Sequence, residues 1–372
     1  MRILYDHQMF ALQRYGGITR VFVELARRLS AESECRVAWY RGYHQDAYDV
    51  SDFRPRLDRY LAFDRPPFGL RTWSRERINW QAFRLFSRAV WRPYDVYHPS
   101  FYDARVAAQP RARRLAVTVY DMIAERLLAD QRKLQPVIEG KRRLVERADV
   151  VFVISDSTRR DAIELLGVEP ERTRLAYPAS DLGSVTPAAL PPALSERPFV
   201  LYVGPRTKYK NFALLQSAFA RDAWLRGNLC VVAVGGSGGF LVPERRALAD
   251  DGLIDQFVHV HGNDALLAGL YRRAVALVYP SRYEGFGIPP LEAMQCGCPV
   301  ICAPTTSLPE VVGDAALFFE QDAADDLAHQ IRRIVEDSAL RTTLIARGVA
   351  QARRFSWDAM ARATLDGYRA VL

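Results

Sequence analysis

The stretch VALVYPSRYEGFGIPPLEAM, residues 275–294, has the order strand, loop and helix that a parallel α/β sheet requires. Residues 275–279 are apolar and rich in β-branched side chains, so we expect a buried parallel strand. Gly285 and Gly287 free the backbone of the loop, and the step Pro289-Pro290 suits the first turn of a helix. The stretch therefore predicts both a strand and a ligand site at its end.

Two carboxylates, Glu284 and Glu292, lie eight positions apart around this loop. The amides of Gly285, Phe286 and Gly287, with Ile288 and the helix that opens near Pro290, are expected to face an anion such as phosphate. Glu284 would accept hydrogen bonds from hydroxyls, and we expect Glu292 in the first helical turn. A ligand with hydroxyls on both sides of its phosphates, such as a nucleotide sugar, fits this arrangement. A packing turn and a carboxylate that serves only the helix dipole are the alternatives.

The segment resembles the E-x7-E signature of retaining GT-B glycosyltransferases, specifically glycosyltransferase family 4. Residues 295–301 and 307–316 also match the pattern that follows the signature in that family. The resemblance implies an α/β chain of GT-B fold, with two Rossmann-like doubly wound domains facing across a cleft. It also implies a retaining, metal-independent hexosyltransferase without a cofactor.

Alternating strands and helices along the chain indicate two parallel sheets. The expected strands are 2–6, 35–40, 96–98, 115–120 and 149–154, then 199–203, 229–234, 257–260, 276–279 and 299–302. A Pro-, Ala- and Ser-rich stretch at 179–197 suits a linker. We therefore expect an N-terminal acceptor-binding domain over 1–185 and a C-terminal donor-binding domain over 190–354. By resemblance, the last helix, within 355–372, crosses back onto the first domain.

Composition fits a soluble protein of two domains. The chain has 372 residues, of which 49% are hydrophobic and 25% charged. No apolar run approaches the roughly 20 residues that span a bilayer, and the chain begins with a strand rather than a signal peptide. The five cysteines include no CxxC pair, which suggests reduced thiols. We expect a cytoplasmic protein.

The formal net charge is +8, and the basic excess lies in the first half of the chain. Arginines alternate with tryptophan, phenylalanine and aliphatic residues between Arg65 and Arg92. This mixture suits an anionic membrane surface, so we expect a peripheral protein at the inner face of the cell membrane. A solvated helix with ordinary core aromatics is the alternative. No recognised nucleic-acid-binding motif accompanies the charge, so nucleic acid is not expected as a partner.

Clustered cations follow the strand that opens the second domain. Lys210, followed by asparagine, matches the basic residue that the family places on the donor pyrophosphate. Arg206 lies one position away from the family's arginine, and Lys208 is a possible substitute. Asn263, in a loop after another strand, would border the nucleotide base by resemblance, or serve only as a turn residue. For each cation the alternative is a solvated side chain.

The first domain offers its own candidates. Gly16 and Gly17 open a helix that carries Arg20, and in similar enzymes this loop lies near the donor phosphates and the acceptor. Similar enzymes often have histidine-aspartate after a central strand; this chain has Tyr120 and Asp121 there, and tyrosine cannot take up a proton at neutral pH as imidazole does. His98 is the nearest replacement on the acceptor side, or else a structural histidine.

The Gly16-Gly17 loop and residues 120–122 most resemble a subgroup of this family that acts in bacterial surface polysaccharide synthesis. By that resemblance we predict transfer of a hexose, preferably mannose or deoxymannose, from a GDP-sugar to a lipid-linked glycan of a surface polysaccharide or O-antigen. Glu292 would hold the ribose, Glu284 the sugar hydroxyls, and Lys210 with Arg206 the leaving diphosphate. A UDP-sugar donor, or a non-catalytic nucleotide- or sugar-binding protein, is the alternative. An NAD enzyme is disfavoured because the glycines at 235–239 do not fit the G-x-G-x-x-G spacing. No metal site is expected, since a DxD motif is absent.

Overall fold

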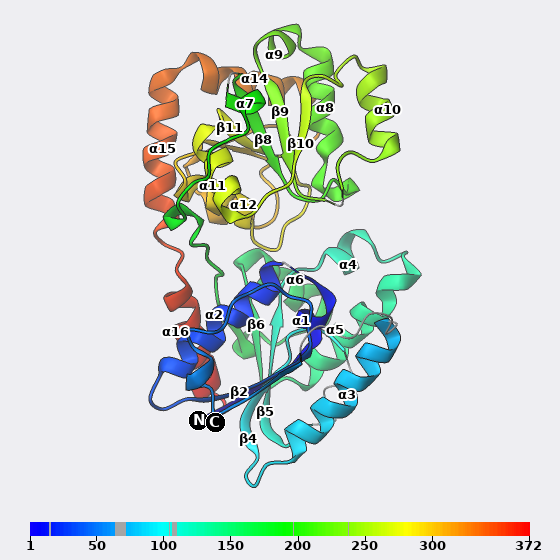
Figure 1. Ribbon diagram of the computed structural model, residues 1–372, viewed down its shortest axis with the longest axis vertical. Coiled ribbons are helices and arrows are strands. Elements are labelled where there is room, and N and C mark those ends of the chain that lie inside the picture. Colours follow the sequence, from blue (N-terminus) through cyan, green and yellow to red (C-terminus); the bar gives the residue numbers. More distant parts are fainter. Residues whose placement is uncertain (15, 64–71, 104, 106–109, 196, 237) are drawn as a thin grey trace. The chain divides into compact units, whose positions relative to one another are not determined.

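The computed structural model describes the chain except residues 15, 64–71, 104, 106–109, 196 and 237. It contains two compact units (Figure 1). Unit 1 comprises Met1–Pro178 and Ser356–Leu372, and unit 2 comprises Ala179–Phe355. The division falls at the start of the expected linker rather than in its middle, and the last helix belongs to unit 1.

Unit 1 is built on a seven-stranded parallel sheet of order β3-β2-β1-β4-β5-β6-β7. Its strands are β1 (Arg2–Tyr5), β2 (Arg36–Tyr43), β3 (Arg59–Phe63), β4 (Tyr94–His98), β5 (Ala112–Val119), β6 (Val150–Val153) and β7 (Thr173–Leu175). On one side of β1 the sheet continues with β2 and β3, and on the other side it continues with β4 to β7. The point between β1 and β4 is therefore the topological switch, where open α/β sheets bind ligands beyond the strand ends.

Helices cover the sheet of unit 1. They are α1 (Gln8–Leu12), α2 (Gly17–Ala31), α3 (Thr72–Arg88), α4 (Ile123–Leu127), α5 (Gln135–Arg147), α6 (Asp156–Leu166) and α16 (Trp357–Arg369). The α2 helix buries Val21, Leu25 and Leu29, as their spacing predicts. The α6 helix begins where the Ser155 side chain accepts from the Thr158 amide and ends at Gly167 in the left-handed conformation.

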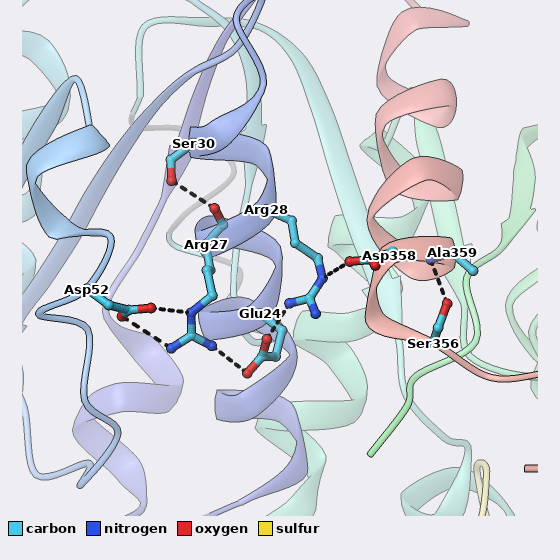
Figure 2. A network of polar contacts seen from close by, with 8 residues as sticks. All are labelled: Glu24, Arg27, Arg28, Ser30, Asp52, Ser356, Asp358 and Ala359. Atoms are coloured by element: carbon cyan, nitrogen blue, oxygen red, sulfur yellow. Dashed lines mark hydrogen bonds and ion pairs between the residues drawn. The ribbon is translucent and has the colours of Figure 1, made fainter. Parts of the chain in front are cut away.

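The C-terminal helix α16 packs on α2, β6 and β7 (Figure 1). Its Gly367 permits a close approach, since an added Cβ would lie 2.5 Å from Cε1 of Phe152. Figure 2 shows the polar rim of this contact, in which Arg28 of α2 donates to Asp358 of α16 at 2.5 Å and also pairs with Glu24. The network also contains Arg27, Ser30, Asp52, Ser356 and Ala359.

Unit 2 contains a six-stranded parallel sheet of order β10-β9-β8-β11-β12-β13. Its strands are β8 (Phe199–Val203), β9 (Cys230–Val234), β10 (Phe257–Val260), β11 (Ala276–Tyr279), β12 (Val300–Cys302) and β13 (Ala316–Phe318). Its helices are α7 (Pro192–Ser195), α8 (Phe212–Arg221), α9 (Ala223–Asn228), α10 (Val242–Asp250), α11 (Asp264–Arg273), α12 (Ile288–Gln295), α13 (Leu308–Val312), α14 (Ala324–Glu336) and α15 (Ser338–Ala352). Both units thus have the predicted doubly wound α/β architecture.

Across the described residues, no helix has both the length and the apolar character needed to span a bilayer.

Candidate active site

The ends of two neighbouring strands bring Lys210 and Glu284 together in unit 2. Lys210 closes a 3-10 turn (Lys208–Lys210) after β8, and Glu284 lies in the loop after β11. Lys210 Nζ donates to both carboxylate oxygens of Glu284, at 2.6 and 2.9 Å, and to the Tyr279 hydroxyl at 3.1 Å. The two charged side chains are only 12% and 8% exposed. This largely desolvated ion pair is the electrostatic centre of the loop.

Two hydroxyl residues after β12 fix the shape of this loop. The Glu284 amide donates to Thr306 Oγ1 at 2.9 Å, and Thr306 Oγ1 donates to the Glu284 carbonyl oxygen at 2.9 Å. Ser307 Oγ donates to the carbonyl oxygen of Phe286 at 2.7 Å. Gly287 has φ +114°, and an added Cβ would lie 2.8 Å from Leu308 Cδ2, so glycine is required there. Sequence reasoning missed Thr306, because nothing in its local pattern distinguishes it.

Glu292 is a buried residue of α12, which begins at Ile288. The first turn of the helix contains no acidic residue, so the prediction that placed Glu292 there was wrong by one position. Its carboxylate accepts from the Tyr271 hydroxyl at 3.2 Å and from Ser180 Oγ at 3.5 Å. Burial raises the pKa of Tyr271 well above its usual value, and the charge of Glu292 raises it further. Tyr271 is therefore a neutral hydrogen-bond donor.

Tyr279 has the same character beside the ion pair. Burial raises the pKa of its hydroxyl well above 10, and the negative charge of Glu284 adds to the effect. The tyrosine therefore stays protonated, and its hydroxyl lies beside both the lysine and the Glu284 carboxylate. Two side chains, Glu284 and Tyr279, thus hold the lysine ammonium group in place.

Arg206 lies in unit 2 but is occupied by other contacts. Its guanidinium donates to Glu244 at 2.9 Å and to the carbonyl oxygens of Gly235 and Gly239, and its side chain is 4% exposed. This placement favours a structural role, and its contact with the leaving diphosphate stays a prediction. Lys208 is exposed. Asn263 caps α11 by accepting from the Leu266 amide at 3.1 Å, which agrees with the turn alternative.

In unit 1, Gly16 and Gly17 stand at the start of α2 as expected. The Gly16 amide donates to Tyr48 Oη at 3.2 Å, and the Tyr48 hydroxyl in turn donates to the Gly16 carbonyl oxygen at 3.0 Å. Arg20 is half-buried in the first turn of α2. Their roles near the donor phosphates and the acceptor stay predictions.

Tyr120 and Asp121 follow β5, where the resemblance places them. Tyr120 is buried, and Asp121 accepts from the Ile123 amide at 3.0 Å. A buried lysine, Lys141 of α5, holds this loop by donating to the Asp121 carbonyl oxygen at 2.8 Å and to Glu125 at 3.0 Å. Sequence reasoning missed Lys141 because a lone lysine in an amphipathic helix resembles a solvated side chain.

His98 ends β4 in the core of unit 1, where it is fully buried. Its Nδ1 bonds Tyr368 of α16 at 2.6 Å, and its Nε2 bonds Thr118 at 2.9 Å. Burial lowers the pKa of His98 to about 3, so the ring is neutral. This placement agrees with the structural alternative and gives no support to an acceptor-side role.

A cavity of about 660 Å³ opens beyond the switch point of unit 1. Aromatic and aliphatic side chains line it together with charged residues of both signs, and the sequence did not predict it. Its lining includes His7 and Gln8 after β1, Tyr43 at the end of β2, Trp80 of α3, Tyr102 and Asp103 after β4, and Val137 of α5. The volume and lining are typical of a small-molecule site.

Two doubly wound units, one with a Lys-Glu pair at a glycine loop, define the class of GT-B glycosyltransferases. Residues 15–183 match the model for Glycosyltransferase Family 4, and residues 191–351 match the model for Glycosyl transferases group 1. O-antigen chain mannosyltransferase B of Escherichia coli is 30% identical, over 95% of this chain and 96% of that protein. The chain belongs to glycosyltransferase family 4.

Solved structures share the fold at lower identity. Sucrose-phosphate synthase of Thermosynechococcus elongatus superimposes with a TM-score of 0.76 at 22% identity, covering 99% of this chain and 98% of the other. HepE of Anabaena, solved in complex with UDP-glucose, gives a TM-score of 0.73 at 17% identity, with complete coverage of both chains. The predicted GT-B fold is confirmed.

Proposed function

We propose that this glycosyltransferase transfers a hexose, preferably mannose or deoxymannose, from a GDP-sugar to a hydroxyl of a lipid-linked glycan, with retention at the anomeric carbon. The observation that carries the proposal is the desolvated Lys210–Glu284 pair beside the start of α12. The name of the Escherichia coli relative supports mannose as the sugar and a surface polysaccharide such as O-antigen as the product.

The site residues divide the work of the reaction. As the bond between the sugar and the diphosphate breaks, Lys210 and the amides at the start of α12 stabilise the charge that develops on the leaving phosphate. Glu284 accepts hydrogen bonds from the sugar hydroxyls, and Glu292 accepts from the ribose. The acceptor hydroxyl attacks from the same face, and its proton passes to a leaving phosphate oxygen. No step requires a metal or a cofactor in this scheme.

Two features of unit 1 support the proposed glycan acceptor and the proposed binding of the enzyme to a membrane surface. The cavity beyond the switch point offers aromatic walls for a sugar ring of the acceptor. The outer face of α3 and of the turn that follows it exposes apolar and basic side chains, namely Ile78, Arg84, Leu85, Trp91 and Arg92. This mixture favours a cytoplasmic enzyme bound to the anionic inner surface of the cell membrane.

A UDP-sugar is the second candidate donor, favoured by the structural likeness to HepE, which was solved with UDP-glucose. Thermal unfolding with GDP, UDP, TDP, ADP and CMP separates the two. A ligand at 100 times its Kd stabilises by about 2.7 kcal/mol, or a few degrees in a protein of this size. We expect GDP to give the largest shift.

The same measurement on Glu284→Gln and on the exposed control Glu336→Gln, followed by assay with GDP-mannose and UDP-glucose, tests the activity. We expect turnover in the control and its loss in Glu284→Gln. A rise in the unfolding temperature with UDP alone would show that the donor is a UDP-sugar rather than a GDP-sugar. Nucleotide binding without turnover of any sugar nucleotide would favour a non-catalytic binding protein, and no shift at all would overturn the proposed function.

A further inference from the structure

Residues Ser180–Val185, near the start of unit 2, lie against α11 and α12, and we name them the strap. We infer that the strap, together with Tyr271, positions the Glu292 carboxylate for the ribose hydroxyls of the nucleotide. The inference rests on the proposed function, in which Glu292 binds the ribose. It assigns Ser180 and Tyr271 as positioning residues that determine the preference for a ribonucleotide.

The strap is fixed by two helices. Gln295 of α12 donates to the Ser180 carbonyl oxygen at 2.5 Å and accepts from the Gly183 amide at 3.5 Å. Arg272 of α11 donates to the Gly183 carbonyl oxygen at 2.9 Å. A Cβ on Gly183 would lie 2.9 Å from the Gln295 carbonyl oxygen, so only glycine allows this approach. The strap is an anchored segment where a linker was expected.

The anchored strap places a hydroxyl on one side of Glu292. Ser180 Oγ approaches Oε1 at 3.5 Å, while the Tyr271 hydroxyl donates to Oε2 at 3.2 Å. Each carboxylate oxygen of Glu292 is thus contacted by a different element, one by the strap and the other by α11. Two contacts from different elements, one to each oxygen, fix the plane of the carboxylate. Two ribose hydroxyls are the kind of bidentate donor that a carboxylate in a fixed plane selects.

Burial of the Glu292 carboxylate makes any change in its orientation costly in free energy. Glu292 is 8% exposed, Tyr271 is fully buried, and Ser180 is 4% exposed. A buried carboxylate that rotates away from its donors loses hydrogen bonds that water does not replace. Tyr271 stays protonated, because burial and the nearby charge raise its pKa. The geometry therefore favours one orientation of the carboxylate before the nucleotide arrives.

A comparison of ligands within each variant tests the inference. The probes are GDP and UDP and their 2′,3′-dideoxy forms, with Kd measured by calorimetry. Wild type should bind the better ribonucleotide at least about tenfold more tightly than its dideoxy form, since hydrogen bonds to a charged group contribute about 1.5–3 kcal/mol. In Tyr271→Phe the ratio should fall by at least about threefold, with the dideoxy affinity unchanged. Ser180→Ala should show a smaller fall, because its contact is longer.

Two matched variants serve as controls. Tyr5→Phe removes a buried hydroxyl in unit 1, and Ser184→Ala removes the strap hydroxyl that donates to the Asp181 carbonyl oxygen. Both should keep the wild-type ratio. General damage to the fold would weaken both forms of the nucleotide equally and leave the ratio intact.

The possible outcomes distinguish the role of Glu292 in binding the ribose from the positioning roles of Tyr271 and Ser180. If wild type shows no preference for the ribose, the proposed role of Glu292 fails. If wild type shows the preference and both Tyr271→Phe and Ser180→Ala retain it in full, the inference is overturned while the proposed function stands.

Discussion

Lys210 and Glu284 show how stability and activity can be separated at one pair of residues. Lys210→Met leaves the Glu284 carboxylate desolvated without its cation, which should lower the free energy of unfolding by about 3 kcal/mol. The double variant Lys210→Met/Glu284→Gln removes both charges and should regain most of that loss. Turnover should be absent in both, since neither retains the lysine charge for the leaving diphosphate. Urea unfolding and a glycosyl-transfer assay check the two expectations.

Lys208→Met is the matched control, because Lys208 is an exposed lysine in the same turn. It should change stability by less than about 0.5 kcal/mol. Recovery of turnover in the double variant would contradict the proposed role of Lys210.

His98 gives a prediction about pH. Its pKa is lowered to about 3 in the folded protein by burial, against about 6.5 in an unfolded chain. The unfolded state therefore binds the proton first, so the stability contribution is complete above pH 6.5 and declines as the pH falls toward 3. The decline approaches about 1.4 kcal/mol per pH unit. Unfolding free energies between pH 7 and 4 should show a shallower slope for His98→Gln than for wild type.

The pH dependence of the unfolding free energy comes from more than one histidine, because burial also lowers the pKa of His7 to about 4. The His98→Gln variant should therefore keep part of the wild-type slope. The exposed His329 provides the control, and His329→Gln should leave the slope unchanged. An unchanged slope in a folded His98→Gln protein would contradict the assignment of His98 as a neutral core residue.

Residues such as Glu284 and Lys210 could be found from the sequence because each lies in a motif beside a strand end. Their partners could not. Tyr271 reaches Glu292 from another helix, and Lys141 reaches the Asp121 loop from 20 positions away. These contacts depend on tertiary packing, and a local pattern does not record it. Arg206 could be found from its motif, but the sequence does not show that its guanidinium donates to Glu244 and to two backbone carbonyl groups.

At the level of elements, α16 is held by packing more than by charge. Gly367→Ala would force a Cβ to 2.5 Å from the buried Phe152 ring and should cost about 1–3 kcal/mol. Asp358→Ala removes an ion pair whose aspartate is 66% exposed (Figure 2), and should cost less than about 1 kcal/mol. Thermal unfolding of the two variants ranks the effects. A larger loss for Asp358→Ala would show that the polar rim dominates.

The outer face of α3 and its following turn predicts binding to anionic vesicles. Leu85 is 73% exposed and Trp91 is 95% exposed, with Arg84 and Arg92 beside them. A basic residue near an anionic surface contributes about 1 kcal/mol, so Arg84→Gln/Arg92→Gln should weaken binding about tenfold or more. Leu85→Ser/Trp91→Ser should weaken it as well. Sedimentation with phosphatidylglycerol-containing vesicles measures both.

The control is an exposed apolar pair in unit 2, Leu241 and Val242 at the start of α10, which are 56% and 81% exposed. Leu241→Ser/Val242→Ser should bind like wild type, and pure phosphatidylcholine vesicles should bind little of any variant. Equal losses in the α3 and α10 variants would show that general surface hydrophobicity, rather than this face, causes the binding.

The central strands were predictable and three edge strands were not. The runs at β6, β8 and β11 are apolar and β-branched, which is typical of parallel strands buried on both faces. The sequence analysis missed β3, β7 and β13, each of which lies at an edge of its sheet. The sequence of β7 is only Thr-Arg-Leu, and half-exposed short strands carry little hydrophobic signal. The contacts of the strap with α11 and α12 were not predictable either, because they join residues about 90 or more positions apart.

At the scale of the whole molecule, we expect catalysis to proceed without a metal ion. Breaking the bond between the sugar and the diphosphate adds one negative charge to the leaving diphosphate, and a glycosyltransferase must stabilise that charge. In the part of the chain that the structure describes, no group of three or more His, Cys, Asp or Glu residues is arranged to hold a metal ion. Lys210 and the start of α12 are instead available for this charge. We expect turnover to stay within about twofold of its original rate after chelation with EDTA. A loss of more than about tenfold that Mg²⁺ restores would show that the cation is metal rather than lysine.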